Sequence, residues 1–570
     1  MGALPGRTRR AESTSKVTSL AAAVRASVFP GATLLFAFTH NRSHAAAFEV
    51  ARQFRDRKCL TLAATGLLEY ASILVAAGAI ARMECAFAGG TYPAPTPSRQ
   101  LQIAMDGGAD NDPDWTNLTM TLRLMAGALG WPFAPTNSLV GSGLWSERGR
   151  AAIKDPFTGG DTAVVAALRP DVAFLHAPIA DTLGNTIVHA PDAEESWGVF
   201  AARRVVVTAE RVVAPEEFRA IGPRNGVPGP LVDHVVLAPF GAHPQGQFVW
   251  SKEEGVESYA EDYAFRQTLR GLARDPKALR AWVEDWVFGT DHESYLARLG
   301  AARLENLRAE AMSPRPATAK GRDEPASPEE RAAVLAMRIA EGKAVDGEAE
   351  TFFAGIGLAH LAAWGAERRC RERGVAVALI AETGMVGFRP IAGDPYLFNR
   401  PNAASSLFHA GFVRTLGALA GANARRCLAL LAAAQIDLAG NINSSRAADG
   451  RLIVGSGGAN DLASGAAACL VVMPLKAGRF VETLPFVTTP IRHCAGVATD
   501  LGLLERGDDG ALRVAGVTCE AGEERAALAR LAERCGRELA VAPTLARYEP
   551  PTSSELALLR GFDPQRAILA

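Results

Sequence analysis

A single glutamate in the second half of the sequence stands where it could meet a ligand. In VALIAETGMVG (377–387), Glu382 follows an apolar run that predicts a buried strand, and Thr383 and Gly384 come directly after it. Open α/β sheets bind their ligands at the carboxyl ends of the strands, so a carboxylate at this point is a candidate functional group. The competing interpretation is a helix cap or a strand-end charge that faces water.

A glycine-rich turn further along the chain could hold an anion. IVGSGGAND (453–461) contains Gly455, Gly457 and Gly458. Glycines let backbone N–H groups approach a ligand closely or form an anion-binding nest. An ordinary glycine turn before a helix is the alternative.

A second glycine-rich turn precedes an Ala/Leu-rich stretch that predicts a helix. GIGLAH (355–360) contains Gly355 and Gly357, and helix N-termini bind anions. The motif ends at His360, where a dinucleotide-binding loop needs a third glycine. A Rossmann cofactor is therefore not expected.

Other common chemical motifs are missing. The sequence contains no G-x-S-x-G, no H-E-x-x-H and no G-x-x-x-x-G-K-[ST]. Its ten histidines never pair with a carboxylate or a thiol at the spacing of helical metal ligands. We therefore predict no metal site.

The composition argues against several classes of partner. Sixty Lys and Arg residues balance 61 Asp and Glu, and 48% of the residues are apolar. We expect no nucleic-acid or polybasic membrane surface, because both need clustered cations. The apolar stretches near 17–38 and 415–434 contain arginines, so no membrane span is predicted. Eight scattered cysteines predict reduced thiols, and a cytoplasmic protein is the default expectation.

The sequence predicts two domains of the α/β class. Residues 312–328 combine Pro, Ser and mixed charge and predict a linker between domains 1–311 and 329–570. In each half, Ala-rich amphipathic segments alternate with short β-branched runs, which suit buried strands of a mostly parallel sheet. These runs are DVAFLHA (171–177), RVVVTAERVV (204–213), VAVALIAE (375–382) and CLVVMP (469–474).

A weak internal repeat links the halves. The pattern D-x-x-G-N occurs at Asp181 and again at Asp437, 256 residues later, each time after a predicted strand. Two related halves would explain this spacing. Asp, Gly and Asn all favour tight connections, so two unrelated turns are the alternative.

Taken together and in this order, the motifs resemble the family I CoA-transferases, most closely the glutaconate CoA-transferase type with its two subunits fused end to end. The first half resembles the α subunit in FAFTHNRSHAAAFEVAR (36–52), ALGWPFAPTNSLVGSGL (128–144), PDVAFLHAPIADTLGN (170–185), VDHVVLAPFGAHP (232–244) and WVFGTDHESYLARLGAARLENL (286–307). The second half resembles the β subunit in GIGLAHLAA (355–363), LIAETGMVG (379–387), AAQIDLAGNINSS (433–445), VGSGGANDLASGA (454–466) and FVTTPI (486–491). The resemblance implies two similar open α/β lobes.

The resemblance also implies a mechanism. Glu382 matches the glutamate that attacks an acyl-CoA thioester, so CoA would pass to a carboxylic acid by ping-pong covalent catalysis through a glutamyl anhydride and a glutamyl-CoA thioester. The acyl-CoA is a substrate, and no permanently bound cofactor or metal is implied. The oxyanion and CoA would be held by residues of the glycine turns and one amide: Gly455, Gly457, Gly458, Gln435, Gly355 and Gly357.

The acid substrate is less well defined. The segment that matches the substrate region, AFAGGTYPAPTPS (86–98), departs from the family pattern and is rich in proline. Thr91 or Ser98 could hold the substrate's second carboxylate, and a rigid proline-rich loop is equally consistent. The family forms larger assemblies, which implies a homo-oligomer.

Two alternatives remain at this level. Relatives of the same fold hydrolyse acyl-CoA or cleave rings, using an acidic residue in the α-like half. The corresponding stretch here, WTNLTMTLRLMAGALG (115–130), contains no acid, which favours a transferase. The other alternative, a module that binds or isomerises phosphosugars, explains neither the paired halves nor the position of Glu382.

Overall fold

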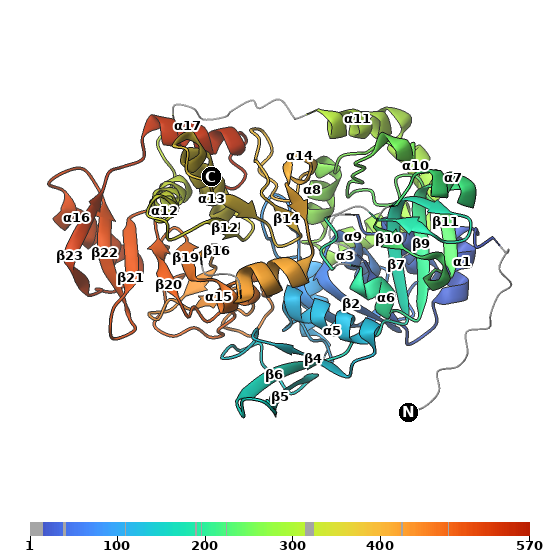
Figure 1. The fold of residues 1–570 in the computed structure, drawn as a ribbon, viewed down its shortest axis with the longest axis horizontal. Coiled ribbons are helices and arrows are strands. Elements are labelled where there is room, and N and C mark those ends of the chain that lie inside the picture. Colours follow the sequence, from blue (N-terminus) through green and yellow to red (C-terminus); the bar gives the residue numbers. More distant parts are fainter. Residues whose placement is uncertain are drawn as a thin grey trace.

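A computed structural model describes residues 15–37, 41–108, 110–188, 191–194, 196–223, 225–313, 324–422, 426–476 and 478–570. Within these residues the chain forms two lobes that lie side by side, each around its own sheet (Figure 1). The first lobe comprises the elements up to α11, and the second lobe those from α12 onward. The linker expected over 312–328 lies mostly outside the described residues.

The first lobe is built on an eight-stranded sheet. Six strands run parallel in the order β3-β2-β1-β7-β9-β11, and the short strands β8 and β10 add antiparallel pairs beside β7. The strands are β1 (Thr33–Phe36), β2 (Leu60–Leu67), β3 (Ile80–Ala88), β7 (Val172–Asp181), β8 (Thr186–Ile187), β9 (Arg204–Val213), β10 (Gly226–Val227) and β11 (His234–Leu237).

The second lobe is built on a ten-stranded sheet. Its parallel centre has the order β13-β12-β16-β19-β20, with β14 and β15 at one edge and β21, β22 and β23 at the other. The strands are β12 (Thr351–Ala354), β13 (Ala378–Ile380), β14 (Met385–Val386), β15 (Phe408–His409), β16 (Cys427–Ala432), β19 (Ala468–Val472), β20 (Cys494–Ala498), β21 (Gly502–Arg506), β22 (Leu512–Thr518) and β23 (Val541–Tyr548). A separate hairpin joins β17 (Gln435–Ile436) and β18 (Ile442–Asn443).

The two sheets follow the same plan. In the first, β1 lies between β2 and β7; in the second, β12 lies between β13 and β16. In both, the chain begins in the middle of the sheet, builds one side of it, and then crosses to build the other side. The predicted fold class, two similar open α/β lobes with mostly parallel sheets, is confirmed.

Helices cover both sheets, and a small sheet projects from the first lobe at the bottom of Figure 1. The small sheet has the order β4-β6-β5, with β4 (Phe133–Thr136), β5 (Arg150–Lys154) and β6 (Asp161–Ala166). Helices of the first lobe are α1 (Leu20–Ser27), α2 (His44–Gln53), α3 (Glu69–Ala76), α4 (Arg99–Asp106), α5 (Asn117–Leu129), α6 (Trp197–Ala201), α7 (Pro215–Ala220), η1 (Gly229–Leu231), η2 (Lys252–Glu254), α8 (Tyr263–Leu272), α9 (Pro276–Val283), η3 (Glu284–Phe288), α10 (His292–Leu299) and α11 (Ala301–Met312). Those of the second are α12 (Pro328–Val345), α13 (Leu358–Glu372), α14 (Arg400–Ser405), η4 (Val413–Ala422), α15 (Ala459–Gly465), α16 (Glu524–Cys535) and α17 (Ser553–Phe562).

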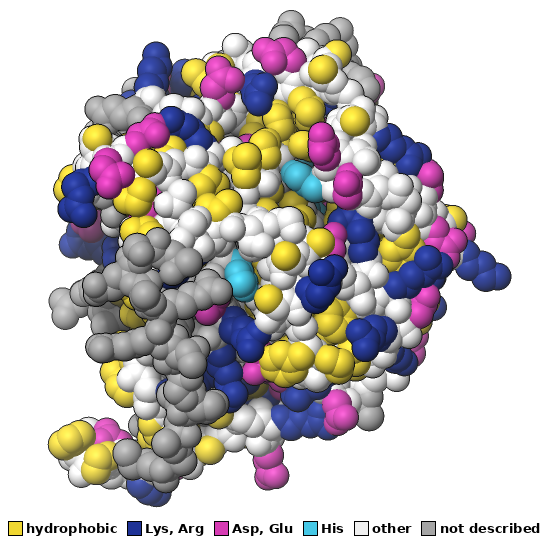
Figure 2. Space-filling model, turned by 90° about the vertical axis from the view of Figure 1, so that its right-hand side faces the viewer, with side chains coloured by type: hydrophobic (Ala, Val, Ile, Leu, Met, Phe, Trp, Pro, Cys, Tyr) yellow, Lys and Arg dark blue, Asp and Glu magenta, His cyan; other side chains and the backbone are white. Residues whose placement is uncertain are grey.

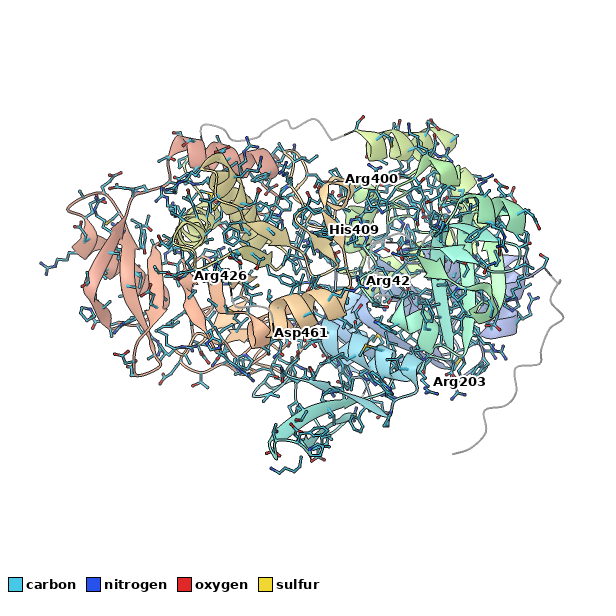
Figure 3. All side chains as sticks on the ribbon, viewed as in Figure 1. Arg42, Arg203, Arg400, His409, Arg426 and Asp461 are labelled. Carbon is cyan, nitrogen blue, oxygen red and sulfur yellow. The ribbon has the colours of Figure 1, made fainter. Side chains whose placement is uncertain are left out.

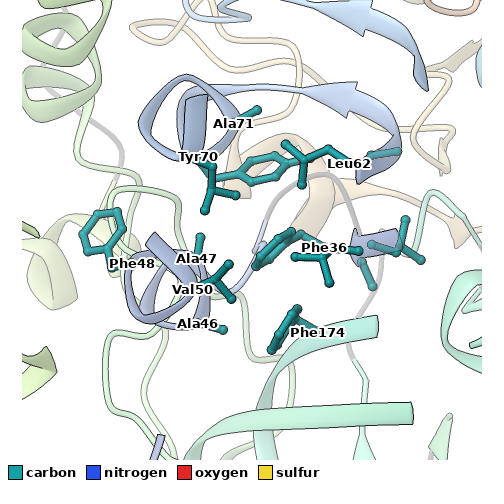
Figure 4. Close-up of a cluster of buried hydrophobic side chains, with 14 of the residues drawn as sticks. Phe36, Ala46, Ala47, Phe48, Val50, Leu62, Tyr70, Ala71 and Phe174 are labelled. Carbon is teal, nitrogen blue, oxygen red and sulfur yellow. The ribbon is translucent and has the colours of Figure 1, made fainter. Parts of the chain in front are cut away.

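The core of the first lobe forms where helices cover the parallel strands. Strand β7 is buried at every position, as its apolar run predicts. On the neighbouring strand, Phe36 stacks on Phe174 with ring centroids 4.9 Å apart and contacts Tyr70 of α3 at 5.1 Å (Figure 4). Ala46 and Ala47 of α2 belong to the same cluster, and their small side chains let the helix pack close to the sheet.

The D-x-x-G-N repeat forms the same turn in both lobes. Asp181 accepts hydrogen bonds from the backbone N–H (2.8 Å) and the side-chain amide (2.6 Å) of Asn185. Asp437 accepts the equivalent bonds from Asn441, at 2.9 and 3.0 Å. In each turn the Asp carboxylate accepts a backbone N–H that has no neighbouring strand to bond to, which explains why Asp and Asn recur at this spacing.

Backbone pairing joins the lobes. The edge strand β3 of the first lobe meets the glycine turn of the second, where Ala88 N–H donates to Val454 O (2.8 Å) and Gly457 N–H donates to Ala86 O (3.0 Å). The turn therefore acts as a short extra strand beside β3. This pairing brings the first turn of α5 to the same place.

Three structural features bear on the predictions made from the composition: the cysteines, the surface charges and the apolar character of the helices. All eight cysteines are free, and six are buried. On the face shown in Figure 2, basic and acidic side chains are interspersed. No helix in the described part of the chain combines the length and apolar character needed to span a bilayer.

Candidate active site

Glu382 lies two residues beyond the end of β13, in a sharp turn. Gly384 has φ +118°, and a β-carbon there would stand 1.8 Å from the Ala410 carbonyl oxygen, so only glycine fits this turn. The Thr415 hydroxyl donates to the Glu382 carbonyl oxygen at 2.8 Å. These contacts fix the backbone of Glu382, while the residue as a whole stays partly exposed.

Gly458 packs directly against the Glu382 carboxylate. A β-carbon on Gly458 would stand 2.1 Å from Oε2 of Glu382 and 3.2 Å from Cδ1 of Leu416. The Gly458 N–H also lowers the pKa of this carboxylate. Any side chain at this position would displace the carboxylate, so glycine is required by close approach.

The other two glycines of this turn have a different task. The Gly457 N–H donates to Ala86 O across the lobes, and the Gly455 N–H donates to Ser444 O at 3.3 Å. A β-carbon on Gly455 would stand 2.5 Å from Ala86 O. Both residues hold the turn against β3, and of the three glycines Gly458 is the one that packs against the Glu382 carboxylate.

The turn 355–360 caps a helix. The Gly355 N–H donates to Leu430 O (3.0 Å), and the Gly357 N–H donates to Nδ1 of His360 (2.8 Å). His360 Nε2 donates to the Pro395 carbonyl at 2.9 Å, and burial lowers the pKa of this histidine to about 4. His360 is therefore a neutral capping residue of α13, which explains why histidine replaces the third glycine.

Gln435 is engaged within its own lobe. Its amide nitrogen donates to the Gly478 carbonyl at 2.9 Å, and its amide oxygen accepts from Asn443 at 3.0 Å. Both ends of the side chain are thus occupied in this conformation, and neither bonds to Glu382.

Asn117 brings the first lobe to the carboxylate. It is the first residue of α5, and its backbone N–H donates to Gly457 O at 2.9 Å. Its side-chain amide acts on the Glu382 carboxylate and lowers its pKa. The candidate site is therefore built by both lobes, with Glu382 and Gly458 from one and Asn117 from the other.

Asp461 lies directly behind this group. Figure 3 places it on α15 in the middle of the molecule, where the second lobe meets the first. It is 2% exposed, and it accepts hydrogen bonds from Thr116 Oγ1 (2.5 Å) and Leu118 N–H (3.0 Å), while the Ser138 side chain lowers its pKa. All three residues belong to the first lobe and all are neutral.

The two carboxylates of the site both hold their protons more tightly than usual. Burial, and next the charge of Asp461, raises the pKa of Glu382 from 4.5 to about 7, although bonds from Asn117 and Gly458 oppose the shift. Burial raises the pKa of Asp461 from 3.8 to about 6. A carboxylate with a raised pKa is more basic and hence a better nucleophile once it is ionised.

Thr91 lies in a buried cluster around an arginine. The Arg266 guanidinium donates to the Thr91 hydroxyl (2.9 Å) and to Glu69 (2.8 Å), and it also pairs with Glu261. The Tyr396 hydroxyl of the second lobe lies 3.2 Å from the Thr91 hydroxyl. Thr91 is thus one member of a contact between the lobes.

Ser98 caps a helix and lines a pocket. Its hydroxyl accepts from the Leu101 N–H of α4 at 3.4 Å and lies 3.1 Å from the Ser72 hydroxyl. The pocket lies among α3, α8, α9 and the loop after β3. Its lining comprises Leu68, Glu69, Ser72, Ile73, Gly89, Gly90, Pro97, Ser98, Leu269, Arg270, Ala273 and Leu279.

Two residues of the site could not be singled out from the sequence. The role of Asn117 could not be recognised because a lone asparagine at the start of a helix usually indicates a cap. Asp461 is part of the glycine motif, and its signal is an acid in an otherwise apolar and glycine-rich run. In the part of the chain that the structure describes, no three His, Cys, Asp or Glu residues gather as metal ligands.

Comparison with known proteins gives consistent matches. The coenzyme A transferase family pattern matches residues 17–238. The chain is 31% identical to one of the subunits of glutaconate CoA-transferase from Acidaminococcus fermentans over 316 residues, which is 52% of this chain and 95% of that polypeptide. It is 30% identical to an uncharacterized protein from Archaeoglobus fulgidus over 266 residues, 46% of this chain and 57% of the relative's length.

A solved structure matches nearly the whole chain. The acyl-CoA transferase YdiF from Escherichia coli O157:H7 superimposes with a TM-score of 0.65, covering 95% of this chain and 97% of that one at 14% identity. At this identity the match concerns the fold. It extends over both lobes, including the one outside the matched family pattern.

Proposed function

The chain belongs to the coenzyme A transferase family, and on that premise we propose that it moves CoA from an acyl-CoA to a carboxylic acid through covalent intermediates on Glu382. In the first step the Glu382 carboxylate attacks the thioester carbonyl and releases CoA as a thiolate, leaving an acyl-glutamyl anhydride. The thiolate then attacks the glutamyl carbonyl and releases the donor acid, so that CoA is held as a glutamyl thioester.

The second half of the cycle reverses these steps with another acid. The acceptor carboxylate attacks the glutamyl-CoA thioester, and the released thiolate attacks the acyl carbonyl of the new anhydride. Products are the new acyl-CoA and the free Glu382 carboxylate. Each step exchanges one activated acyl bond for another, so the energy of the thioester is retained and no ATP is consumed.

The observation that carries this proposal is the convergence of Gly458 and Asn117 on one carboxylate. Each tetrahedral intermediate carries an oxyanion that needs fixed donors. In the resting site Gly458 packs against the Glu382 carboxylate, and the Gly458 N–H and the Asn117 amide both lower its pKa. Loss of one such donor costs about 10²–10³ in rate in other enzymes. Gly458 thus keeps its predicted role in the proposal, and Asn117 takes the role first given to Gln435.

The same geometry favours transfer over the hydrolase alternative. In relatives that hydrolyse or cleave, an acid of the first lobe does the chemistry, whereas here the residue of α5 that faces the site is the amide of Asn117. An amide donates hydrogen bonds but is a poor general base. The nucleophile in this proposal is therefore Glu382 of the second lobe.

For the acid substrate, we propose the pocket beside Ser98. Its wall at Gly89 follows Ala88, whose N–H donates to Val454 O (2.8 Å), and four residues further along that turn Gly458 packs against Glu382. The apolar lining from α3, α8 and α9 suits the hydrocarbon part of an acyl group. Thr91, which bonds to Arg266, would shape the pocket's surroundings without touching the acid.

Trapping the intermediate tests the proposal. The protein is incubated with a panel of acyl-CoA thioesters and no acceptor, reduced with borohydride, and mapped by peptide mass spectrometry. We expect one modified peptide, containing Glu382, from the wild type and none from Glu382→Gln. Glu348→Gln, at an exposed glutamate paired with Lys343, serves as the control and should be trapped like the wild type. A modified peptide elsewhere, or none with any thioester, would refute the mechanism.

A further inference from the structure

We propose that Asp461 is a positioning residue: it holds the first turn of α5 so that the Asn117 amide stays on the Glu382 carboxylate. The inference rests on the proposed function and extends it to a residue that touches neither substrate nor reacting atoms. It assigns a task to the buried acid of the second lobe.

The contacts of three consecutive residues carry the inference. Thr116 Oγ1 donates to one oxygen of Asp461 and Leu118 N–H donates to the other, at 2.5 and 3.0 Å. Between them, the Asn117 N–H donates to Gly457 O at 2.9 Å. The glycine turn and the helix α15 that follows it thus bind three consecutive residues at the start of α5, and Asp461 bonds to the residues on both sides of Asn117.

A carboxylate is well suited to bind the N-terminus of α5. The first N–H groups of a helix have no partners within it and carry partial positive charge, so a carboxylate stabilises them. Asp461 supplies that carboxylate from the other lobe, next to the helix's own cap, Thr116. The side chain cannot relax toward water because it is 2% exposed. The direction of Asn117 is therefore set by the contact between the lobes.

Precision matters at this point because Asn117 is the contribution of the first lobe to the carboxylate. Misplacing a catalytic group by about 1 Å can cost about 10² in rate. If Asp461 loses its oxygens, α5 keeps its own Thr116 cap and remains helical. The position of α5 relative to the second lobe then changes.

Two substitutions at Asp461 separate the effect of its hydrogen bonds from the effect of its charge. Asp461→Ala removes both acceptors, and we expect kcat/KM to fall about 10²-fold, mainly through kcat. Asp461→Asn can keep both bonds, with its amide oxygen on Leu118 N–H and its amide nitrogen on Thr116, so its loss should stay below about 10-fold. Thr116→Val removes one of the two bonds and should lie between them.

A double-mutant cycle then asks whether Asp461 acts through Asn117. We expect Asn117→Ala alone to lose about 10², and Asn117→Ala with Asp461→Ala to lose little more than the worse single variant. Multiplied losses of about 10⁴ would overturn the inference, because they would mean that the two residues act independently. A purely structural role of Asp461 predicts the multiplied result.

The pH profile gives a second readout. Among the described residues, the charged group that shifts the pKa of Glu382 is Asp461, and the other groups that shift it are the neutral Asn117 and Gly458. Asp461→Asn removes that negative charge, so the acid limb of the rate of glutamyl adduct formation should move to lower pH. An unmoved limb would show that the acid does not act on Glu382.

Asp500→Ala and Asp500→Asn are the matched controls. Asp500 is 3% exposed, lies in the same lobe, accepts the Leu475 N–H at 2.7 Å and has a pKa raised by burial. These variants should cost similar stability and keep most of the activity. If activity falls in proportion to the loss of melting temperature in both the Asp461 and the Asp500 variants, the inference is overturned. Failure of the wild type to form any adduct would instead reject the proposed function.

Discussion

Gly458 leaves no room for an atom between itself and Glu382. The position that a β-carbon would take lies 2.1 Å from the carboxylate oxygen, well inside van der Waals contact. We therefore expect Gly458→Ala to lose at least about 10² in kcat, through loss of the N–H contact and displacement of the nucleophile. Gly342→Ala, in α12 with open space around it, is the control and should leave the rate unchanged. Full activity in Gly458→Ala would contradict the arrangement of the site.

Ionisation of Glu382 should govern the first half-reaction. Its pKa is raised to about 7 by burial and by Asp461, and only the carboxylate attacks the thioester. The rate of adduct formation should rise about tenfold per pH unit below pH 7 and level off above it. Rapid-quench measurements between pH 5 and 9 can follow this. A flat profile would mean that the nucleophile has an ordinary pKa or is another group.

The same raised pKa predicts a stability difference. The folded protein binds the Glu382 proton more tightly than the unfolded chain, so wild-type stability falls as pH rises from about 4.5 to 7. Glu382→Gln lacks this titration. Relative to wild type it should gain stability across that window, by up to about 3 kcal/mol, and then stay level. Thermal midpoints at pH 4, 5, 6, 7 and 8 test the sign, and a difference independent of pH would contradict it.

The cluster around Arg266 should depend on the arginine far more than on one of its partners. Arg266→Met removes the positive charge that pairs with Glu69 and Glu261, and it should destabilise the protein by about 3–5 kcal/mol. Burial raises the pKa of Glu261 to about 7, so its neutral form is readily accessible and Glu261→Gln should cost much less. Chemical denaturation at pH 7 compares them. Equal losses would show that Glu261 is fully charged in the fold.

Filling the pocket beside Ser98 should change the choice of acid. Ala273 is 6% exposed at the pocket wall, and Ala273→Leu adds volume without touching Glu382 or the glycine turns. We expect turnover of larger acids to fall by about 10-fold or more while a two-carbon acid is little affected. Val345→Leu, on the exposed end of α12, also introduces a leucine and serves as the control. An unchanged ratio of large to small acids would place the acyl group elsewhere.

The fold could be foreseen because its strands carry strong local signals. The run at 171–177 became part of β7, which is buried throughout, and the run at 204–213 became β9 over the same residues. The run at 375–382 gave a strand of only three residues, 378–380, because the turn at Gly384 begins early. Local pattern indicates a strand, and tertiary contacts decide its length.

The site could be foreseen only in part. The resemblance to the CoA-transferases assigned Glu382 and Gly458 to one site, whereas the residues alone left a strand-end charge and an ordinary turn as alternatives. The task of each glycine was not visible: Gly455 and Gly457 serve the pairing with β3, and Gly357 binds His360. Asn117 comes from the other lobe, 265 residues earlier, and its part depends on how two sheets dock.

Docking of the two lobes within one polypeptide has a consequence for how the site responds to concentration. The groups that meet at Glu382 come from separate halves, and a covalent connection keeps each half in the presence of its mate at a high effective concentration. A site divided between separate polypeptides empties as an enzyme is diluted toward the dissociation constant of its components. In this chain both halves are always made one to one, and dilution cannot part them.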